Sequence, residues 1–187
     1  MEATLQAPIT AAAYLDQEAQ ASNKSEYYAG QVIAMAGAQE PHNLIVANLL
    51  AELVFCLKKK ECRVYASDQL VYLPEGDRYV YPDISVVCQK PDLQKHRGID
   101  VLLNPTMIVE VISSSTELLD KGAKLEAYLC LASLQTYALV DSRRVYAQVY
   151  SRQDTQRWTL QTSDQQTDTL SLDQCPIKLE EVYRLVF

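Results

Sequence analysis

The chain alternates between segments with helical spacing of apolar residues and short runs of β-branched and aromatic residues. Thr10 is a suitable N-cap, and the segment AAAYLDQEAQ after it predicts a first helix. From Pro41 to Leu57, apolar residues recur every three or four positions, which predicts a longer amphipathic helix. A third helix is predicted after the turn at residues 113–116, which can cap it. Its apolar stripe would be Leu118, Gly122, Leu125 and Leu129.

The segments between these helices predict β-strands. The expected strands are a hairpin of Tyr27-Tyr28 with 31–35, then 62–66, 70–73, 84–88, 107–112, 137–141, 145–149, 157–161 and 169–172. The strand 107–112, MIVEVI, is apolar on both faces, as in central strands, except for one Glu. Residues 89–98 are rich in Lys, His and Arg, and a loop is expected there. A short helix is expected around 179–183.

This order of elements predicts an α/β fold, with α+β character, a mixed sheet and a C-terminal β extension. A chain of 187 residues has the size of one domain. We therefore expect a single domain, with a helical N-terminal arm over 1–22, a core over 23–142, and a β meander and tail over 143–187.

Composition and charge exclude some classes of protein. Hydrophobic residues make up 48% of the chain and charged residues 22%, which excludes disorder for most of it. The net charge of −7 argues against a protein that coats nucleic acid by bulk electrostatics. It does not exclude nucleic-acid chemistry at a single metal-bridged site.

The cysteines and the apolar runs indicate in which cellular compartment the protein is expected. Five Cys with no C-x-x-C pair are expected to be reduced small hydrophobes in a cytoplasmic protein. The longest apolar run, within 44–57, is interrupted by Asn48 and Glu52 and is expected to be too short to span a bilayer.

Two acidic residues, Asp83 and Glu110, occupy unusual positions next to or within predicted apolar strands. Asp83 follows Pro82, which marks a strand start or a bulge because Pro cannot donate to a sheet ladder. A turn Asp that caps the loop is the alternative for Asp83. Glu110 must be desolvated within its apolar strand, so it needs a cation: Arg, Lys or a metal. A structural ion pair is the alternative for Glu110.

Three polar residues share one flank of the third predicted helix. Lys124 lies four residues after Asp120 and four before Tyr128, beside the apolar stripe. An exposed salt bridge, worth about 0.3–0.5 kcal/mol, is the alternative for Lys124.

Together, Asp83, Glu110 and Lys124 supply what phosphodiester hydrolysis needs. Two carboxylates from neighbouring strands can hold Mg²⁺, which prefers oxygen ligands. The ion polarises the phosphate and lowers the pKa of a water, and a Lys orients that water or neutralises charge in the transition state.

The order of these motifs resembles the bacterial Uma-type family of restriction endonucleases, within the PD-(D/E)XK nuclease superfamily. The segments that carry the resemblance are SEYYAGQVIAMAG, EPHNLI, YPDISVVC and NPTMIVEVISSSTELLDKGAKLEAYLCLASLQTYALVD. The likeness runs from about Leu15 to the C-terminal LEEVYRLVF. It implies a restriction-endonuclease-like PD-(D/E)XK core.

The resemblance also assigns residues. It makes Asp83 and Glu110 the metal-binding acids, with the Val111 carbonyl as a further ligand. The superfamily pattern has Lys two positions after the second acid, where this chain has Ile112. In this family the lysine matches Lys124, on the following helix.

Supporting roles are implied for four further residues. Glu26, in SEYYAG, matches an N-terminal acid that helps to hold metal or to position the lysine. Asp120 and Tyr128 match the helix motif, and His42 matches a recurring His at the start of the first long helix. Local hydrogen bonding of a helix-start His is the alternative for His42.

The predicted activity is Mg²⁺-dependent hydrolysis of phosphodiester bonds in DNA, with Mn²⁺ as a substitute ion. A catalytically inactive nuclease fold that serves as a dimerisation or nucleic-acid-binding module is the alternative, and the acidic composition favours it. A homodimer is expected because cutting a duplex needs two sites, and no membrane partner is expected. A zinc hydrolase is rejected, because the two His are far apart in sequence.

Local positive charge for DNA has two candidate sources in the sequence. Lys90, Lys95 and Arg97 form one cluster, and Arg143 with Arg144 forms another. Solvated loops are the alternative for both.

Overall fold

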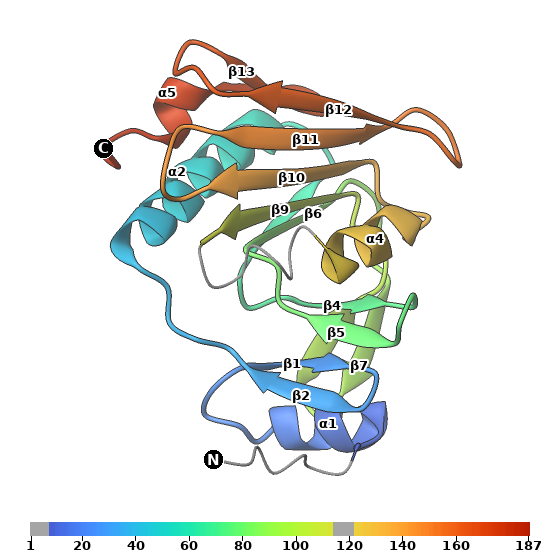
Figure 1. Ribbon diagram of the computed structural model, residues 1–187. Helices are drawn as coiled ribbons and strands as arrows, with labels where there is room; N and C mark the ends of the chain where they lie inside the picture. The colour runs from blue at the N-terminus through green and yellow to red at the C-terminus, as the bar shows by residue number, and fades with distance from the viewer. Residues whose placement is uncertain (1–7, 114–121) are drawn as a thin grey trace.

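The computed structural model describes residues 8–113 and 122–187, and it builds them into two six-stranded sheets, a two-stranded hairpin and four helices (Figure 1). The helices are α1 (Ala11–Glu18), α2 (Glu40–Leu57), α4 (Ala123–Cys130) and α5 (Leu179–Val182). Thr10 caps α1, since its hydroxyl accepts a hydrogen bond from the Ala13 amide at 3.2 Å. Figure 1 shows the two sheets one above the other, with the N-terminus below and the C-terminus above.

The lower sheet, called the N-terminal sheet, has the strand order β2-β1-β5-β4-β8-β7. Its strands are β1 (Ser25–Tyr28), β2 (Gln31–Ala34), β4 (Leu70–Leu73), β5 (Arg78–Val80), β7 (Leu93–His96) and β8 (Ile99–Leu102). Neighbours are antiparallel except β4 and β8. Tyr14 of α1 stacks on Tyr27 of β1, with ring centroids 5.3 Å apart, which fixes α1 on this sheet.

The upper sheet, called the central sheet, has the order β12-β11-β10-β9-β6-β3. Its strands are β3 (Arg63–Ala66), β6 (Ile84–Val87), β9 (Met107–Ile112), β10 (Thr136–Asp141), β11 (Ala147–Arg152) and β12 (Trp158–Ser163). Strands β9 and β10 run parallel and their other neighbours antiparallel. The hairpin of β13 (Thr169–Leu172) and β14 (Cys175–Lys178) precedes α5.

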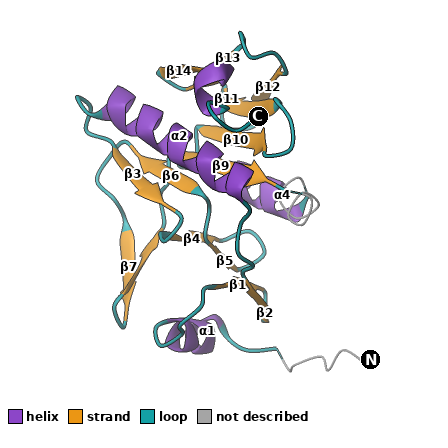
Figure 2. Ribbon diagram, turned by 90° about the vertical axis from the view of Figure 1, so that its left-hand side faces the viewer, coloured by secondary structure: helices purple, strands orange, loops and turns teal. Residues whose placement is uncertain are grey.

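The two faces of the central sheet are covered differently. On one face, α2 buries a stripe at helical spacing against β6, β9 and β10 (Figure 2). The stripe is Ile45, Leu49, Leu53 and Leu57. On the other face, residues of β9 and β10 pack with α4 and with strands β4, β5 and β8 of the N-terminal sheet. Polar groups of β9 on this second face therefore lie between the two sheets.

Most predicted elements appear at their predicted places. The structure differs at 89–98, where a loop was predicted and β7 with the turn before β8 is found. Edge strand β7 is only partly covered, so its polar residues Gln94 and Lys95 stay exposed and hide the strand from a hydrophobic pattern. The strands also divide between two sheets, where one mixed sheet was expected. Helix α4 carries part of the third predicted helix, while 114–121 lie outside the described residues.

The length and composition of helix α2 are relevant to the expectation that the chain has no membrane span. It is 18 residues long, and among the described helices it alone is long and apolar enough to cross a membrane by length and composition. The expectation that this run is too short is therefore not supported by length. Its stripe of Ile45, Leu49, Leu53 and Leu57 packs on the central sheet.

The expectation that all five cysteines are reduced is wrong for four of them. Cys56 of α2 is bonded to Cys175 of β14, 119 residues away. Cys62 and Cys88 flank the paired strands β3 and β6 and form a second disulfide. Cys130 carries a free thiol. Only the tertiary fold brings these partners together, so their sequence spacing shows no pattern. Disulfides are rare in the reducing cytosol, which weighs against the cytoplasmic prediction.

Candidate functional site

Glu110 lies on β9, on the face of the central sheet that is turned toward α4 and the N-terminal sheet. Its neighbours along β9 are fully apolar, and its side chain points to the face that α4 covers, beside Ile108 and Ile112. Only 3% of Glu110 is exposed. Oε1 of Glu110 lies 3.0 Å from Nζ of Lys124 and accepts a hydrogen bond from the Tyr128 hydroxyl at 3.1 Å. The buried carboxylate thus has the cation that its desolvation requires.

Asp83 reaches the same place because of the proline before it. Strand β6 pairs with β9 up to Ile84 opposite Val109, so continuing the register puts Pro82 opposite Val111. The Val111 amide instead donates to Oδ2 of Asp83 at 2.7 Å. The Asp83 amide donates to Oε2 of Glu110 at 3.3 Å. The two acids are therefore joined through main-chain groups of neighbouring strands.

The same register explains why the Val111 carbonyl is a candidate ligand. In an antiparallel ladder, the N–H and C=O of one residue point to the same side of the strand. The Val111 carbonyl therefore faces Asp83, as its amide does. The position opposite is Pro82, which has no N–H to donate to this carbonyl.

His42 joins the cluster from α2. Pro41 lies in the first turn of α2 and His42 follows it, so its ring is carried at the helix start. Nε2 of His42 lies 3.2 Å from Oδ2 of Asp83. His42 thus contacts the site acid directly.

Lys124 connects the acids to the N-terminal sheet. It lies in the first turn of α4 and is 4% exposed, so the exposed salt bridge considered for it is wrong. Nζ lies 3.0 Å from Glu110 Oε1 and 3.3 Å from Oε1 of Glu26, on β1. One ammonium therefore contacts two buried carboxylates from different sheets.

Glu26 is held by a second set of donors. Its Oε1 accepts the Tyr81 amide at 2.9 Å, and its Oε2 accepts the Tyr28 hydroxyl. Sequence reasoning did not assign roles to Tyr28 and Tyr81. The signal was present for Tyr28, because residues 26 and 28 lie on one face of the same strand. The contact of Tyr81 is through its backbone, which sequence patterns do not reveal.

The buried tyrosines act as donors to these carboxylates. Burial, followed by the negative charge of Glu110, raises the pKa of Tyr128 well above its ordinary value. Burial also raises the pKa of Tyr28 well above its ordinary value. Both hydroxyls therefore stay protonated at neutral pH and can only donate to the adjacent acids.

The structure brings together most of the predicted site residues in one network. The residues that meet are Glu26, His42, Asp83, Glu110, Lys124 and Tyr128, with the main chain of Val111. Asp120 lies outside the described residues. The network joins both sheets, α2 and α4, which are far apart in sequence (Figure 2).

The chemistry of the donor set can be compared with the needs of a metal ion. Within 8–113 and 122–187, no group of three or more His, Cys, Asp and Glu side chains has the geometry of a metal centre. Mg²⁺ commonly takes one or two carboxylates and completes its shell with water and substrate phosphate. Asp83, Glu110 and the Val111 carbonyl offer such an all-oxygen set. Within the described residues, the side-chain hydrogen bonds and the ion pair of Asp83 all go through Oδ2, which leaves Oδ1 for an ion.

Comparisons with known proteins identify the family of this chain. Residues 11–182 match the Uma2 family, described as "Putative restriction endonuclease". Two proteins of Synechocystis sp. (strain ATCC 27184 / PCC 6803 / Kazusa), uncharacterized proteins sll1609 and slr1290, are each 33% identical to this chain, over 152 and 161 residues. The first alignment covers 81% of this chain and 85% of the relative, and the second covers 85% and 82%.

A solved crystal structure has a similar fold. A crystal structure from Anabaena variabilis ATCC 29413, titled as "a putative nuclease belonging to DUF820", superposes with a TM-score of 0.71 at 19% identity. The match covers 96% of this chain and all of that one. The predicted α+β fold class of restriction-endonuclease type is confirmed. The chain belongs to the Uma2 family of restriction-endonuclease-like nucleases.

Proposed function

We propose that the protein is a metal-dependent endonuclease that hydrolyses phosphodiester bonds in DNA. One observation carries the proposal: Asp83, Glu110 and Lys124 meet in a single network although 41 residues separate the first from the last in sequence. Family membership supports the nuclease class. The choice of DNA and of Mg²⁺, or Mn²⁺, rests on the chemistry of the site.

Asp83, Glu110 and the Val111 carbonyl would hold the ion. When bound, Mg²⁺ would polarise the phosphate and lower the pKa of an attacking water. The surrounding residues orient the carboxylate oxygens of Asp83 and Glu110. Val111 and His42 both contact Oδ2 of Asp83, which fixes that carboxylate. Tyr128 and Lys124 fix Oε1 of Glu110.

Lys124 is the group that handles charge at the reacting centre. Its ammonium lies 3.0 Å from Glu110, so it can orient a water beside the acids or stabilise negative charge on the phosphate. Glu26 lies 3.3 Å from the same ammonium and acts as a positioning residue, because it holds the lysine from the opposite side. No other described lysine contacts these acids.

A second function competes with cleavage. A nuclease fold that binds nucleic acid or a second copy without cutting is favoured by two observations: the net charge of −7 and the engagement of Glu110 by Lys124. Homodimerisation fits either function. Cutting both strands of a duplex needs two sites, and the function without cutting includes binding of a second copy.

A plasmid-nicking assay separates the two functions. Wild type with Mg²⁺ or Mn²⁺ is expected to convert supercoiled DNA to nicked and linear forms, and EDTA is expected to stop it. Asp83→Asn removes one charge without changing shape and is expected to abolish nicking. Asp164→Asn makes the same chemical change at an exposed residue of the loop before β13 and is expected to cut like wild type. Equal nicking by both variants would show that the activity comes from another site or a contaminant.

A further inference from the structure

The turn between β10 and β11 lies at the same end of the central sheet as the acidic cluster. Strands β9 and β10 are parallel, with Leu139 opposite Glu110 and Asp141 opposite Ile112. The Ser142 amide and hydroxyl both donate to the Ile112 carbonyl, at 3.0 and 2.9 Å. The turn is therefore tied to β9 two residues beyond Glu110.

The carboxylate of Asp141 points to the same face as Glu110. Side chains alternate along a strand, and Leu139 packs with Ile112 and Tyr128 on the face that α4 covers. Asp141, two residues after Leu139, lies on that face. From a rise of ~3.3 Å per residue and a strand spacing of ~4.8 Å, the Cα atoms of Asp141 and Glu110 are about 8 Å apart.

Two arginines gather on Asp141. Arg143 binds it through Nε and Nη2, both at 2.8 Å, and through its amide at 2.9 Å. Nε of Arg144 lies 3.6 Å from Oδ2 of Asp141. Asp141 is 1% exposed, whereas the side chain of Arg144 is 64% exposed. Arg143 alone matches the charge of the buried carboxylate, so Arg144 adds an outward-facing positive charge.

The structure holds Arg144 in place, which distinguishes it from an ordinary solvated arginine. Its guanidinium stacks over the ring of Tyr146, 4.4 Å from the centroid. The Tyr183 hydroxyl, from the end of α5, accepts the Tyr146 amide at 3.1 Å and lies 2.8 Å from the Asp141 carbonyl. A pre-ordered guanidinium loses little conformational entropy when it binds an anion.

Other cationic clusters lie away from this end. Arg97 contacts Asp16 of α1 and belongs to the β7–β8 hairpin, at the far edge of the N-terminal sheet (Figure 2). Lys58 to Lys60 follow the C-terminal end of α2, which is about 27 Å long, while His42 marks its start. Of these three clusters, the β10–β11 turn is the one that the strand register places beside the acids.

We propose that Arg144 contacts a backbone phosphate of the bound DNA, next to the phosphate that is cleaved. The inference rests on the proposed function, since it supplies the cation that an acidic nuclease needs beside its metal site. A guanidinium matches the geometry of a phosphate, and phosphate contacts fix the register of a protein on DNA without reading its sequence.

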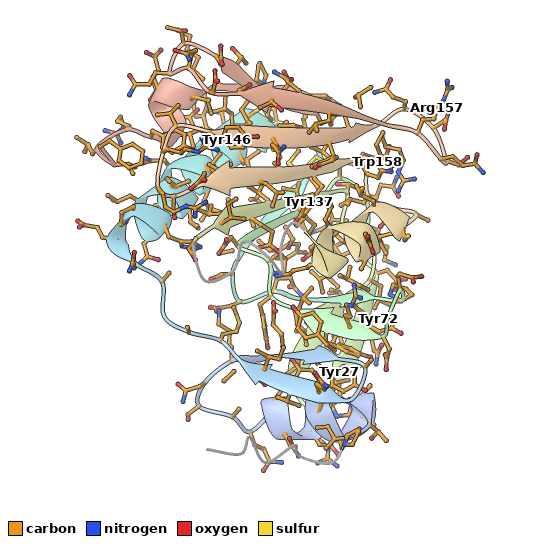
Figure 3. All side chains as sticks on the ribbon, in the orientation of Figure 1. Tyr27, Tyr72, Tyr137, Tyr146, Arg157 and Trp158 are labelled. Carbon is orange, nitrogen blue, oxygen red and sulfur yellow. A yellow bond between two sulfur atoms is a disulfide. The ribbon has the colours of Figure 1, made fainter. Side chains whose placement is uncertain are left out.

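The chain offers a matched control for Arg144. Arg157 also pairs with an Asp three residues before it, at 2.6 Å, and its side chain is 81% exposed. It lies in the next turn, between β11 and β12. Figure 3 shows Arg157 and Tyr146, the partner of Arg144, at opposite ends of the central sheet. Arg144→Gln and Arg157→Gln therefore make the same change of charge at the two ends of β11.

The test is a salt titration of DNA binding in the Asp83→Asn background, which removes cleavage. Binding of a fluorescent duplex is followed by anisotropy for the parent, Arg144→Gln and Arg157→Gln, each checked by thermal unfolding. Arg144→Gln is expected to weaken binding about fivefold and to lower the slope of log K against log salt by about 0.9, the value for one phosphate contact. Arg157→Gln is expected to bind like the parent.

The outcomes separate this inference from the proposed function. If wild type nicks DNA but the two arginine variants bind equally, the Arg144 contact is wrong and the nuclease function stands. If the parent binds DNA and Arg144→Gln alone weakens binding, but wild type never cuts, the contact stands and the catalytic proposal fails. Absence of DNA binding by the parent and by wild type alike, together with no nicking by wild type, overturns both.

Discussion

Replacing Lys124 by Met tests the buried centre of the network most severely. The ammonium lies 3.0 Å from Glu110 and 3.3 Å from Glu26, and its side chain is 5% exposed. Met keeps the length of the side chain but leaves two desolvated carboxylates without their shared cation. Removing one partner of a buried ion pair costs about 3–5 kcal/mol.

The remaining donors decide where in this range the loss falls. Glu110 keeps the Tyr128 hydroxyl and the Asp83 amide, and Glu26 keeps the Tyr81 amide and the Tyr28 hydroxyl. These bonds compensate part of the charge, so we expect the lower end, about 3 kcal/mol. For a chain of this size the midpoint of thermal unfolding would fall by about 6–12 °C.

Circular dichroism melts of three variants make the measurement specific. Lys178→Met removes an exposed ion pair with Glu180 and is expected to leave the midpoint unchanged. The double variant Lys124→Met, Glu26→Gln removes one of the two uncompensated charges and is expected to recover part of the lost stability. A Lys124→Met protein that melts like wild type, or no recovery in the double variant, would refute the buried network.

Two further predictions concern the turn that holds Arg144 and the disulfide that spans the chain. Burial alone would raise the pKa of Asp141, but hydrogen bonds from the side chain and amide of Arg143 outweigh it and hold this pKa below its ordinary value. That stabilisation is present above the ordinary Asp pKa of about 4 and is lost as pH falls through the native value, so Arg143→Gln should cost about 2 kcal/mol at pH 7 in urea unfolding and progressively less below pH 4. A loss that does not change with pH would contradict the pairing. The Cys56–Cys175 disulfide closes a loop of 119 residues, so the Cys56→Ala, Cys175→Ala variant should unfold about 4 kcal/mol more easily, whereas equal stability with and without the bridge would count against it.

Much of the fold follows from local patterns in the sequence. The period of apolar residues locates α2, and the run MIVEVI, apolar except for Glu110, identifies β9 as a central strand buried on both faces. What local patterns do not carry is the assembly of strands into sheets. The division into two sheets depends on β4 pairing with β8 and on β6 pairing with β9, which are contacts between strands that are distant in the sequence.

The candidate site shows the same limit. Glu110 is identifiable because a charge within an apolar strand demands a partner. The identity of that partner is less accessible: sequence spacing favoured an exposed pair for Lys124, and only the packing of α4 between the sheets turns it inward. The Tyr81 amide and the cysteine pairs carry no sequence signal at all, because they depend on where distant segments meet.

Binding of Mn²⁺, measured by calorimetric titration, tests the central claim most directly, because it does not depend on finding the right DNA. The account predicts that Asp83→Asn and Glu110→Gln each weaken binding by about tenfold or more, since even outer contacts of metal ligands contribute that much. Asp164→Asn is expected to bind like wild type. No Mn²⁺ binding by wild type, or binding that both site variants retain, would contradict a metal site at Asp83 and Glu110.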